Sequence, residues 1–254
     1  MVRLAALLGA FGVVAVVLAA CGGGDEDEPT PAGATSPAAA PTGPTAEERA
    51  AAEPLLKAAA LLAEDLPEGF TFAEERFVTN EQSIAEQLNY SGAPTLEDLN
   101  RWGQILEYEV TYSREVPSIP TDATLYLEVT TSLYRDSAGA DENFEFVRRQ
   151  TTDPEYAKAQ EQESAEAGQD IRDVEISPIS FANVGEDRMA FELRFTTYNS
   201  SLGKDLNYVA QLIGVRRGRA IGTLQVLAVG SPHAVEELED LARTLDERMK
   251  DSLE

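Results

Sequence analysis

Hydrophobic and polar residues alternate along several segments of the chain. In residues 106–112 the hydrophobic side chains fall on every second position, and the same period of two recurs over residues 125–133 and 189–195. This period predicts strands with one face against a core. Residues 206–215 and 220–229 carry hydrophobic side chains at both odd and even positions, which is typical of central strands covered on both faces. Arg217-Gly218 is the predicted hairpin turn between them.

Other segments predict helices. Thr45-Ala46-Glu47-Glu48 is a capping box and predicts a helix to about Glu64, which Pro54 kinks or divides. Short helices are predicted over residues 80–88 and 95–102, two helices over 137–167 on either side of Pro154, and short strands over 71–78 and 171–181. Ser231-Pro232 predicts the start of a last helix. Its hydrophobic stripe comprises Val235, Leu238, Leu241, Leu245 and Met249.

Consecutive strands with helices grouped apart predict an α+β fold. We expect residues 45–254 to form one domain, in which an antiparallel β-sheet is flanked by helices and closed by the C-terminal amphipathic helix.

The N-terminus carries a different pattern. Arg3 is followed by an uncharged stretch over residues 4–20 that ends in Leu18-Ala19-Ala20-Cys21. This motif resembles the lipobox of bacterial lipoproteins. The resemblance implies that residues 1–20 are a signal peptide, that cleavage follows Ala20, and that Cys21 carries a diacylglyceryl anchor in the cell membrane. The alternative is an uncleaved membrane anchor, although residues 4–20 would span only about 26 Å of a core about 30 Å thick. Both place the domain outside the cytoplasm.

Residues 21–44 are rich in Gly, Pro, Ala and Thr and have no hydrophobic periodicity. They predict a disordered, lipidated tether. The net charge is −25, from 45 Asp and Glu against 20 Lys and Arg. Such a polyanion repels phosphate backbones and argues against a nucleic acid partner. The membrane is then reached through the lipid on Cys21. Since Cys21 is the only cysteine, no internal disulfide is possible.

Candidate chemistry is sparse. His233 is the only histidine, and with no second His or Cys to complete a zinc site we interpret it as a polar residue in the first turn of the last helix. No nucleophile elbow, phosphate-binding glycine loop or calcium loop is present, and we expect no metal and no cofactor. Paired carboxylates are available among 45 acidic residues, but nothing in the sequence selects a pair.

Four aromatic residues are the candidate lining of a pocket between sheet and helices. They are Trp102, Tyr108, Tyr112 and Phe191, and the competing interpretation is plain core packing. Tyr126 and Tyr198 are expected to point outward.

Four motifs resemble exported lipoproteins of high-GC bacteria with a PsbP/Mog1-like sandwich. They are residues 134–140 with Phe144, residues 184–187, residues 215–219 and residues 241–249. The resemblance covers roughly residues 66–250. It implies a sheet flanked by helices and no defined activity.

These observations favour a lipid-anchored, extracytoplasmic binding or interaction module without enzymatic activity. The alternatives are a carrier of apolar ligands such as lipids and a carboxylate-dependent hydrolase. A large cavity lined by Leu and Phe would favour the carrier, and a bare aromatic patch over a filled core the interaction module. A cleft with two facing carboxylates would favour the enzyme.

Overall fold

The computed structural model describes residues 42–87, 92–114, 123–166, 170–200 and 202–253. Within these residues a single antiparallel sheet has the strand order β1-β2-β3-β7-β6-β5-β4. The strands are β1 (Phe70–Val78), β2 (Gln104–Arg114), β3 (Ala123–Tyr134), β4 (Ile171–Pro178), β5 (Asp187–Asn199), β6 (Lys204–Arg217) and β7 (Ala220–Val229). The α+β class and the antiparallel sheet are confirmed.

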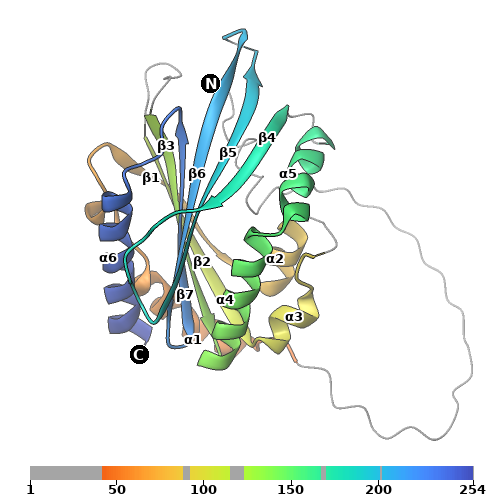
Figure 1. The fold of residues 1–254 in the computed structure, drawn as a ribbon. Coiled ribbons are helices and arrows are strands. Elements are labelled where there is room, and N and C mark those ends of the chain that lie inside the picture. Colours follow the sequence, from red (N-terminus) through yellow and green to blue (C-terminus); the bar gives the residue numbers. More distant parts are fainter. Residues whose placement is uncertain (1–41, 88–91, 115–122, 167–169, 201, 254) are drawn as a thin grey trace, which may run out of the picture.

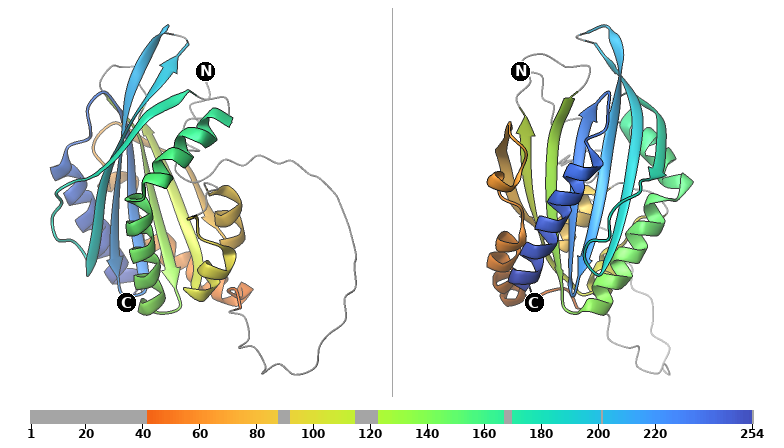
Figure 2. Two further views of the ribbon diagram at one scale, coloured as in Figure 1. Left: turned by 45° about the vertical axis from the view of Figure 1, so that its right-hand side comes forward. Right: turned by 60° about the vertical axis from the view of Figure 1, so that its left-hand side comes forward.

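Helices cover both faces of this sheet (Figures 1 and 2). One face carries α1 (Ala46–Ala59) and α6 (Val235–Leu253), which pack against each other and against β2, β6 and β7. The other face carries α2 (Asn80–Glu86), α3 (Leu96–Arg101), α4 (Ser137–Thr151) and α5 (Pro154–Glu166). The short 3₁₀ helix η3 (Ala63–Asp65) links α1 to β1.

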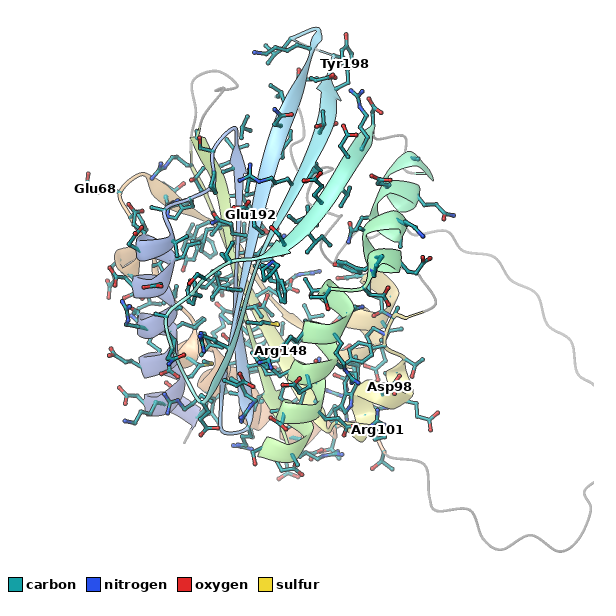
Figure 3. The ribbon with its side chains drawn as sticks, in the orientation of Figure 1. Glu68, Asp98, Arg101, Arg148, Glu192 and Tyr198 are labelled. Atoms are coloured by element: carbon teal, nitrogen blue, oxygen red, sulfur yellow. The ribbon has the colours of Figure 1, made fainter. Side chains whose placement is uncertain are left out.

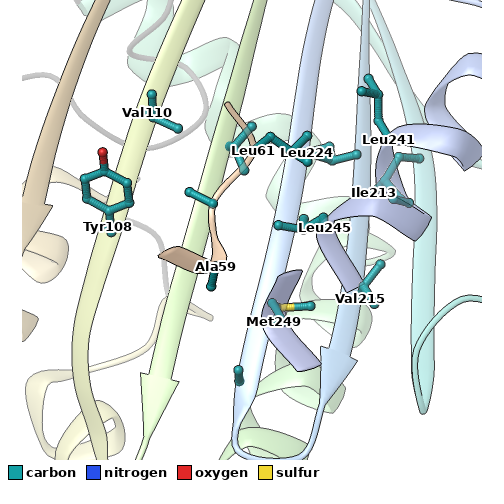
Figure 4. Packing of buried hydrophobic residues seen from close by; sticks show 14 of the residues in the cluster. Ala59, Leu61, Tyr108, Val110, Ile213, Val215, Leu224, Leu241, Leu245 and Met249 are labelled. Atoms are coloured by element: carbon teal, nitrogen blue, oxygen red, sulfur yellow. The ribbon is translucent and has the colours of Figure 1, made fainter. Parts of the chain in front are cut away.

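The face under α1 and α6 is a closed hydrophobic core (Figure 4). Leu56 of α1, Leu245 of α6, and Ile213 and Leu224 of the sheet are 0% exposed. At Gly222 a Cβ atom would lie 2.8 Å from Leu245 Cδ2, so the glycine lets α6 approach β7 closely. Each such aliphatic side chain contributes about 1.5–3 kcal/mol by burial.

The opposite face is held by hydrophobic and polar contacts together. Phe144 of α4 is buried with Trp102, Tyr134 and Met189. Arg148 fastens α4 to β5, because its Nη2 donates to Asp187 Oδ1 at 2.6 Å and to the Arg188 carbonyl oxygen at 3.0 Å (Figure 3).

The start of α4 leaves room for glycine alone. A Cβ atom at Gly139 would lie 1.7 Å from the carbonyl oxygen of Trp102, so α4 approaches the end of α3 directly.

Several predicted elements agree with the structure. The capping box of α1 is confirmed, since Glu48 N–H donates to Thr45 Oγ1 at 3.1 Å and Thr45 N–H donates to Glu48 Oε2 at 2.7 Å. Helix α1 ends at Ala59, earlier than predicted, and passes through Pro54 without dividing. Strands β6 and β7 are interior strands, as their hydrophobic pattern predicts.

The predicted start of the last helix is wrong. Helix α6 begins at Val235, and Leu238 N–H donates to the carbonyl oxygen of Ala234. Ser231 and Pro232 therefore precede the helix, and His233 lies ahead of its first turn rather than within it. The predicted stripe is confirmed, with Leu238, Leu241, Leu245 and Met249 buried.

The predicted signal peptide, Cys21 and most of the predicted tether lie outside the described residues. The last three tether residues are described, and they contact the domain. Arg135 donates to the carbonyl oxygens of Thr42 at 3.0 Å and Gly43 at 3.1 Å, and Pro44 is buried. Arg135 also forms an ion pair with Glu48 at 2.9 Å, so the point where the chain enters the domain is fixed. Across the described residues, the helices are too short or too polar to span a bilayer.

Candidate functional site

A cleft of about 280 Å³ opens on the face of the sheet that carries α2 to α5. Its floor is formed by β2, β3 and β7, and its walls come from β1, α2, α4, α5 and β5. This volume is near the lower end of the range of roughly 300–1,000 Å³ that ligand pockets occupy. The lining side chains include Val78, Glu86, Glu107, Glu109, Glu128, Thr130, Ser132, Phe144, Val147, Met189, Thr223 and Gln225.

The strand register places the polar side chains of the floor in rows. Glu109 of β2 lies opposite Thr130 of β3, which lies opposite Thr223 of β7. In the next row Glu128 of β3 lies opposite Gln225 of β7. Since every second residue of a strand points to the same face, these side chains all point into the cleft.

Glu107 is held by two donors. Its Oε1 accepts hydrogen bonds from Gln104 Nε2 at 2.8 Å and from Ser132 Oγ at 3.3 Å. Burial raises the pKa of Glu107 to about 7, and the nearby charge of Glu109 adds to this shift. The carboxyl group therefore exchanges its proton close to neutral pH.

A buried polar network supports Glu107 from behind. Asn143 Nδ2 donates to the Tyr134 hydroxyl at 2.8 Å, and this hydroxyl donates to Gln104 Oε1 at 3.3 Å. Gln104 is 1% exposed and Tyr134 is 2% exposed. A buried network of this kind fixes side-chain orientations. It holds the Glu107 carboxyl group at the edge of the cleft.

Two further carboxylates complete the acidic part of the floor. Glu128 accepts a hydrogen bond from the Tyr126 hydroxyl, and burial, followed by the charge of Glu109, raises the pKa of Glu128 to about 7. Glu109 accepts a hydrogen bond from Arg76 Nε at 2.6 Å. Burial raises the pKa of Glu109 although Arg76 opposes the shift. Arg76 also pairs with Glu86 at 3.0 Å, so one guanidinium serves two carboxylates.

Gln225 is a polar residue in the floor without a protein partner. It is 9% exposed and lies in the central strand β7. Among the described residues its side-chain amide makes no hydrogen bond, and it lines the cleft beside Glu128.

The wall towards α4 is hydrophobic. Phe144 and Val147 of α4, Met189 of β5 and Ile221 of β7 lie along it. The cleft thus has an acidic part and an apolar part. In the described part of the chain, no group of three or more His, Cys, Asp or Glu residues has an arrangement that could hold a metal ion.

The aromatic residues singled out from the sequence lie elsewhere. Tyr108 and Tyr112 belong to the core under α1 and α6, whereas Trp102 and Phe191 belong to the cluster under α4. Each of the four is 3–6% exposed, and none lines the cleft.

Of the two tyrosines expected to point outward, Tyr198 does so, being 50% exposed near the tip of the β5–β6 hairpin (Figure 3). The expectation for Tyr126 is wrong. It is 7% exposed and belongs to a buried hydrophobic cluster with Leu193 and Leu227.

His233 lies away from the cleft and close to the start of α6. Its Nδ1 is 3.0 Å from Thr124 Oγ1, its Nε2 is 3.0 Å from Glu237 Oε2, and its backbone N–H donates to Gln211 Oε1 at 2.8 Å. Burial lowers the pKa of His233, and Glu237 opposes this shift. These contacts tie the segment before α6 to β3 and β6.

Comparison with known proteins adds little. No protein-family model matches the chain, and no curated protein matches it. Among solved structures, the extracellular domain of PknH from Mycobacterium tuberculosis is similar at 12% sequence identity with a TM-score of 0.36. That alignment covers 82% of this chain and 98% of the other.

Proposed function

We propose that the chain is a lipid-anchored, extracytoplasmic binding module that holds a small ligand in the cleft. The observation that carries this proposal is the set of mostly buried carboxyl groups in an open cleft, with Glu107 held in place by a buried network. Buried carboxylates with incomplete pairing lower stability. Carboxyl groups that are kept together in one cleft despite this cost favour a role in ligand recognition.

The lining distinguishes this module from a carrier of lipids. The cleft contains Phe144 but no leucine, and three glutamates lie in its floor. An acyl chain would leave these carboxyl groups unpaired. We therefore favour a module that binds a polar ligand over a carrier of apolar ligands.

Native mass spectrometry of the protein purified from its own host tests the binding function. We expect a co-purified small molecule that is absent from a Thr223→Phe variant, because the larger side chain fills the floor of the cleft. A Glu53→Gln variant, altered at an exposed position of α1 on the other face, is the matched control and should retain the ligand. A ligand that survives in the Thr223→Phe variant would place binding elsewhere.

The anchor is proposed from Leu18-Ala19-Ala20-Cys21 and from the tether that follows. Cys21→Ser should release the protein into the medium or leave an unprocessed precursor, whereas intact-mass measurement of the wild type should show a diacylglyceryl group on Cys21. Retention of Met1 without a lipid mass contradicts the anchor.

A second candidate function is carboxylate-dependent hydrolysis, and the pair Glu107 and Glu109 favours it. Both side chains point to the same face of β2 and line the cleft, and glycosidases use a pair of carboxyl groups that flank the scissile bond. Turnover in a broad hydrolase screen that disappears in Glu107→Gln and persists in His233→Ala would establish the enzyme and displace the non-enzymatic proposal.

A further inference from the structure

We infer that the ligand of the cleft is a small organic cation, an amine with an apolar body. The ammonium group lies among Glu107, Glu109 and Glu128, and the apolar body lies against the wall formed by Phe144 and Val147. This inference rests on the proposed binding function and names the chemical class of its ligand.

The charge balance of the cleft supports a cation. Glu86, Glu107, Glu109 and Glu128 line it, and Arg76 forms ion pairs with Glu86 and Glu109. Arg76 is already engaged by Glu109 and Glu86, which leaves Glu107 and Glu128 with uncharged donors only. An ammonium group adds the missing positive charge, whereas an anionic ligand adds repulsion in a poorly solvated site.

Gln225 gives a second, independent indication of a ligand. The residue is 9% exposed, lines the cleft beside Glu128, and has a side-chain amide without a hydrogen-bond partner among the described residues. An amide can donate and accept at once, so it suits a ligand that carries a hydroxyl or carbonyl group near its amine.

The apolar wall accounts for the remaining part of the ligand. Val147 is partly exposed at this wall, and the buried side chains of Phe144 and Met189 also line it. Transfer of an aryl or alkyl group from water to this surface is favourable. A ligand with both properties is held at two ends, which fixes its orientation.

Isothermal titration calorimetry on the full chain at pH 8 tests the inference with three probes of matched shape. They are 2-phenylethylamine, the neutral 2-phenylethanol and the anionic 3-phenylpropanoate. We expect the amine to bind at least ten times more tightly than the alcohol, and the anion to show no binding. Equal affinity for the amine and the alcohol, or preference for the anion, overturns the inference.

Two variants separate binding from folding. Glu128→Gln removes one charge and keeps an acceptor for Tyr126, and Gln225→Leu replaces an unpartnered amide by hydrocarbon of similar size. Each should weaken amine binding at least fivefold while leaving the unfolding midpoint unchanged or higher. Glu53→Gln should leave both quantities unchanged. Undiminished amine affinity in both cleft variants overturns the inference.

The outcomes also distinguish the inference from the proposed function. If native mass spectrometry finds a neutral or anionic ligand that Thr223→Phe excludes, the binding function stands and the cationic ligand class is wrong. If the amine binds equally well to the wild type and to Thr223→Phe, the cleft is not the binding site, and both the proposed function and the ligand class are wrong.

Discussion

The two faces of the sheet carry different kinds of side chain. Under α1 and α6 the side chains are mostly aliphatic and closely packed, and the predominant residues are Leu, Ala and Val. Under α2 to α5 the same strands present Glu109, Thr130 and Thr223 to a hollow. Since both faces belong to the same strands, the first can supply the stability that the second gives up. The comparison indicates that the larger hydrophobic core lies on one face and the proposed binding site on the other.

The largest expected effect comes from opening a cavity in the closed face. Leu245 is 0% exposed and packs over Gly222. We expect Leu245→Ala to lower the free energy of unfolding by about 2–5 kcal/mol, because the surrounding helices cannot collapse fully into the space. Urea denaturation at pH 7 measures this loss.

The same variant should not alter recognition. Below its unfolding midpoint, Leu245→Ala should bind 2-phenylethylamine with the affinity of the wild type, because the cleft lies on the other face. A large loss of affinity with a small loss of stability would reverse the roles of the two faces.

The carboxyl groups of the cleft should produce the next largest effect. Because Glu107 and Glu128 have pKa values of about 7 in the fold against an ordinary value of 4.5, the folded state binds their protons more tightly than the unfolded state. Their stabilising contribution is complete below pH 4.5 and disappears as the pH rises through 7. Allowing for solvent in the cleft and for the shared influence of Glu109, we expect the pair to make the protein about 2–3 kcal/mol less stable at pH 8 than at pH 5.5.

Denaturation curves at the two pH values check this effect, and the double variant Glu107→Gln, Glu128→Gln is the control. Its stability should depend less on pH than that of the wild type, and it should be the more stable protein at pH 8. The groups that face the two carboxyls are Glu74, Arg76, Glu86, Glu109, Tyr126 and Tyr134. An unchanged pH dependence in the double variant would assign the effect to the net charge of the whole chain.

Local signals in the sequence predict most of the fold. Thr45 and Thr95 each cap a helix through the third residue that follows, and both hydrogen bonds are present. The stripe of α6 and the hydrophobic pattern of β7 are likewise properties of a single segment. The pattern of Ser231-Pro232 is that of a helix cap, but α6 begins later because Gln211 of β6, the strand beside β7, holds His233 in a loop by two hydrogen bonds.

The cleft depends on contacts between segments that are distant in sequence. Glu107 and Glu109 alternate with hydrophobic residues, and that pattern is typical of a face in solvent. The alternation does not reveal that α2 and α4 cover this face, or that Glu128 lies in the same hollow. The aromatic candidates failed to reach the cleft for a related reason. Tyr108 follows the period of the core face, and a large ring on that face packs rather than lines a hollow.

The smallest effect is expected at His233, which belongs to neither face. Its imidazole contacts Thr124 and Glu237, so His233→Ala removes one hydrogen bond and one partly exposed contact while Gln211 still holds the backbone. We expect a loss of about 1 kcal/mol in the free energy of unfolding, the usual scale for one hydrogen bond, and unchanged binding of 2-phenylethylamine.

Burial lowers the pKa of His233 in the fold, and Glu237 and Arg114 are the charges that act on it. The folded state therefore binds this proton less tightly than the unfolded state, and His233 costs stability as the pH falls below its ordinary value of 6.5. As the pH falls, His233 therefore lowers the stability of the fold, whereas Glu107 and Glu128 raise it. His233→Ala should consequently steepen the gain in stability between pH 8 and pH 5.5, and a shallower gain would mean that the histidine is protonated in the folded protein.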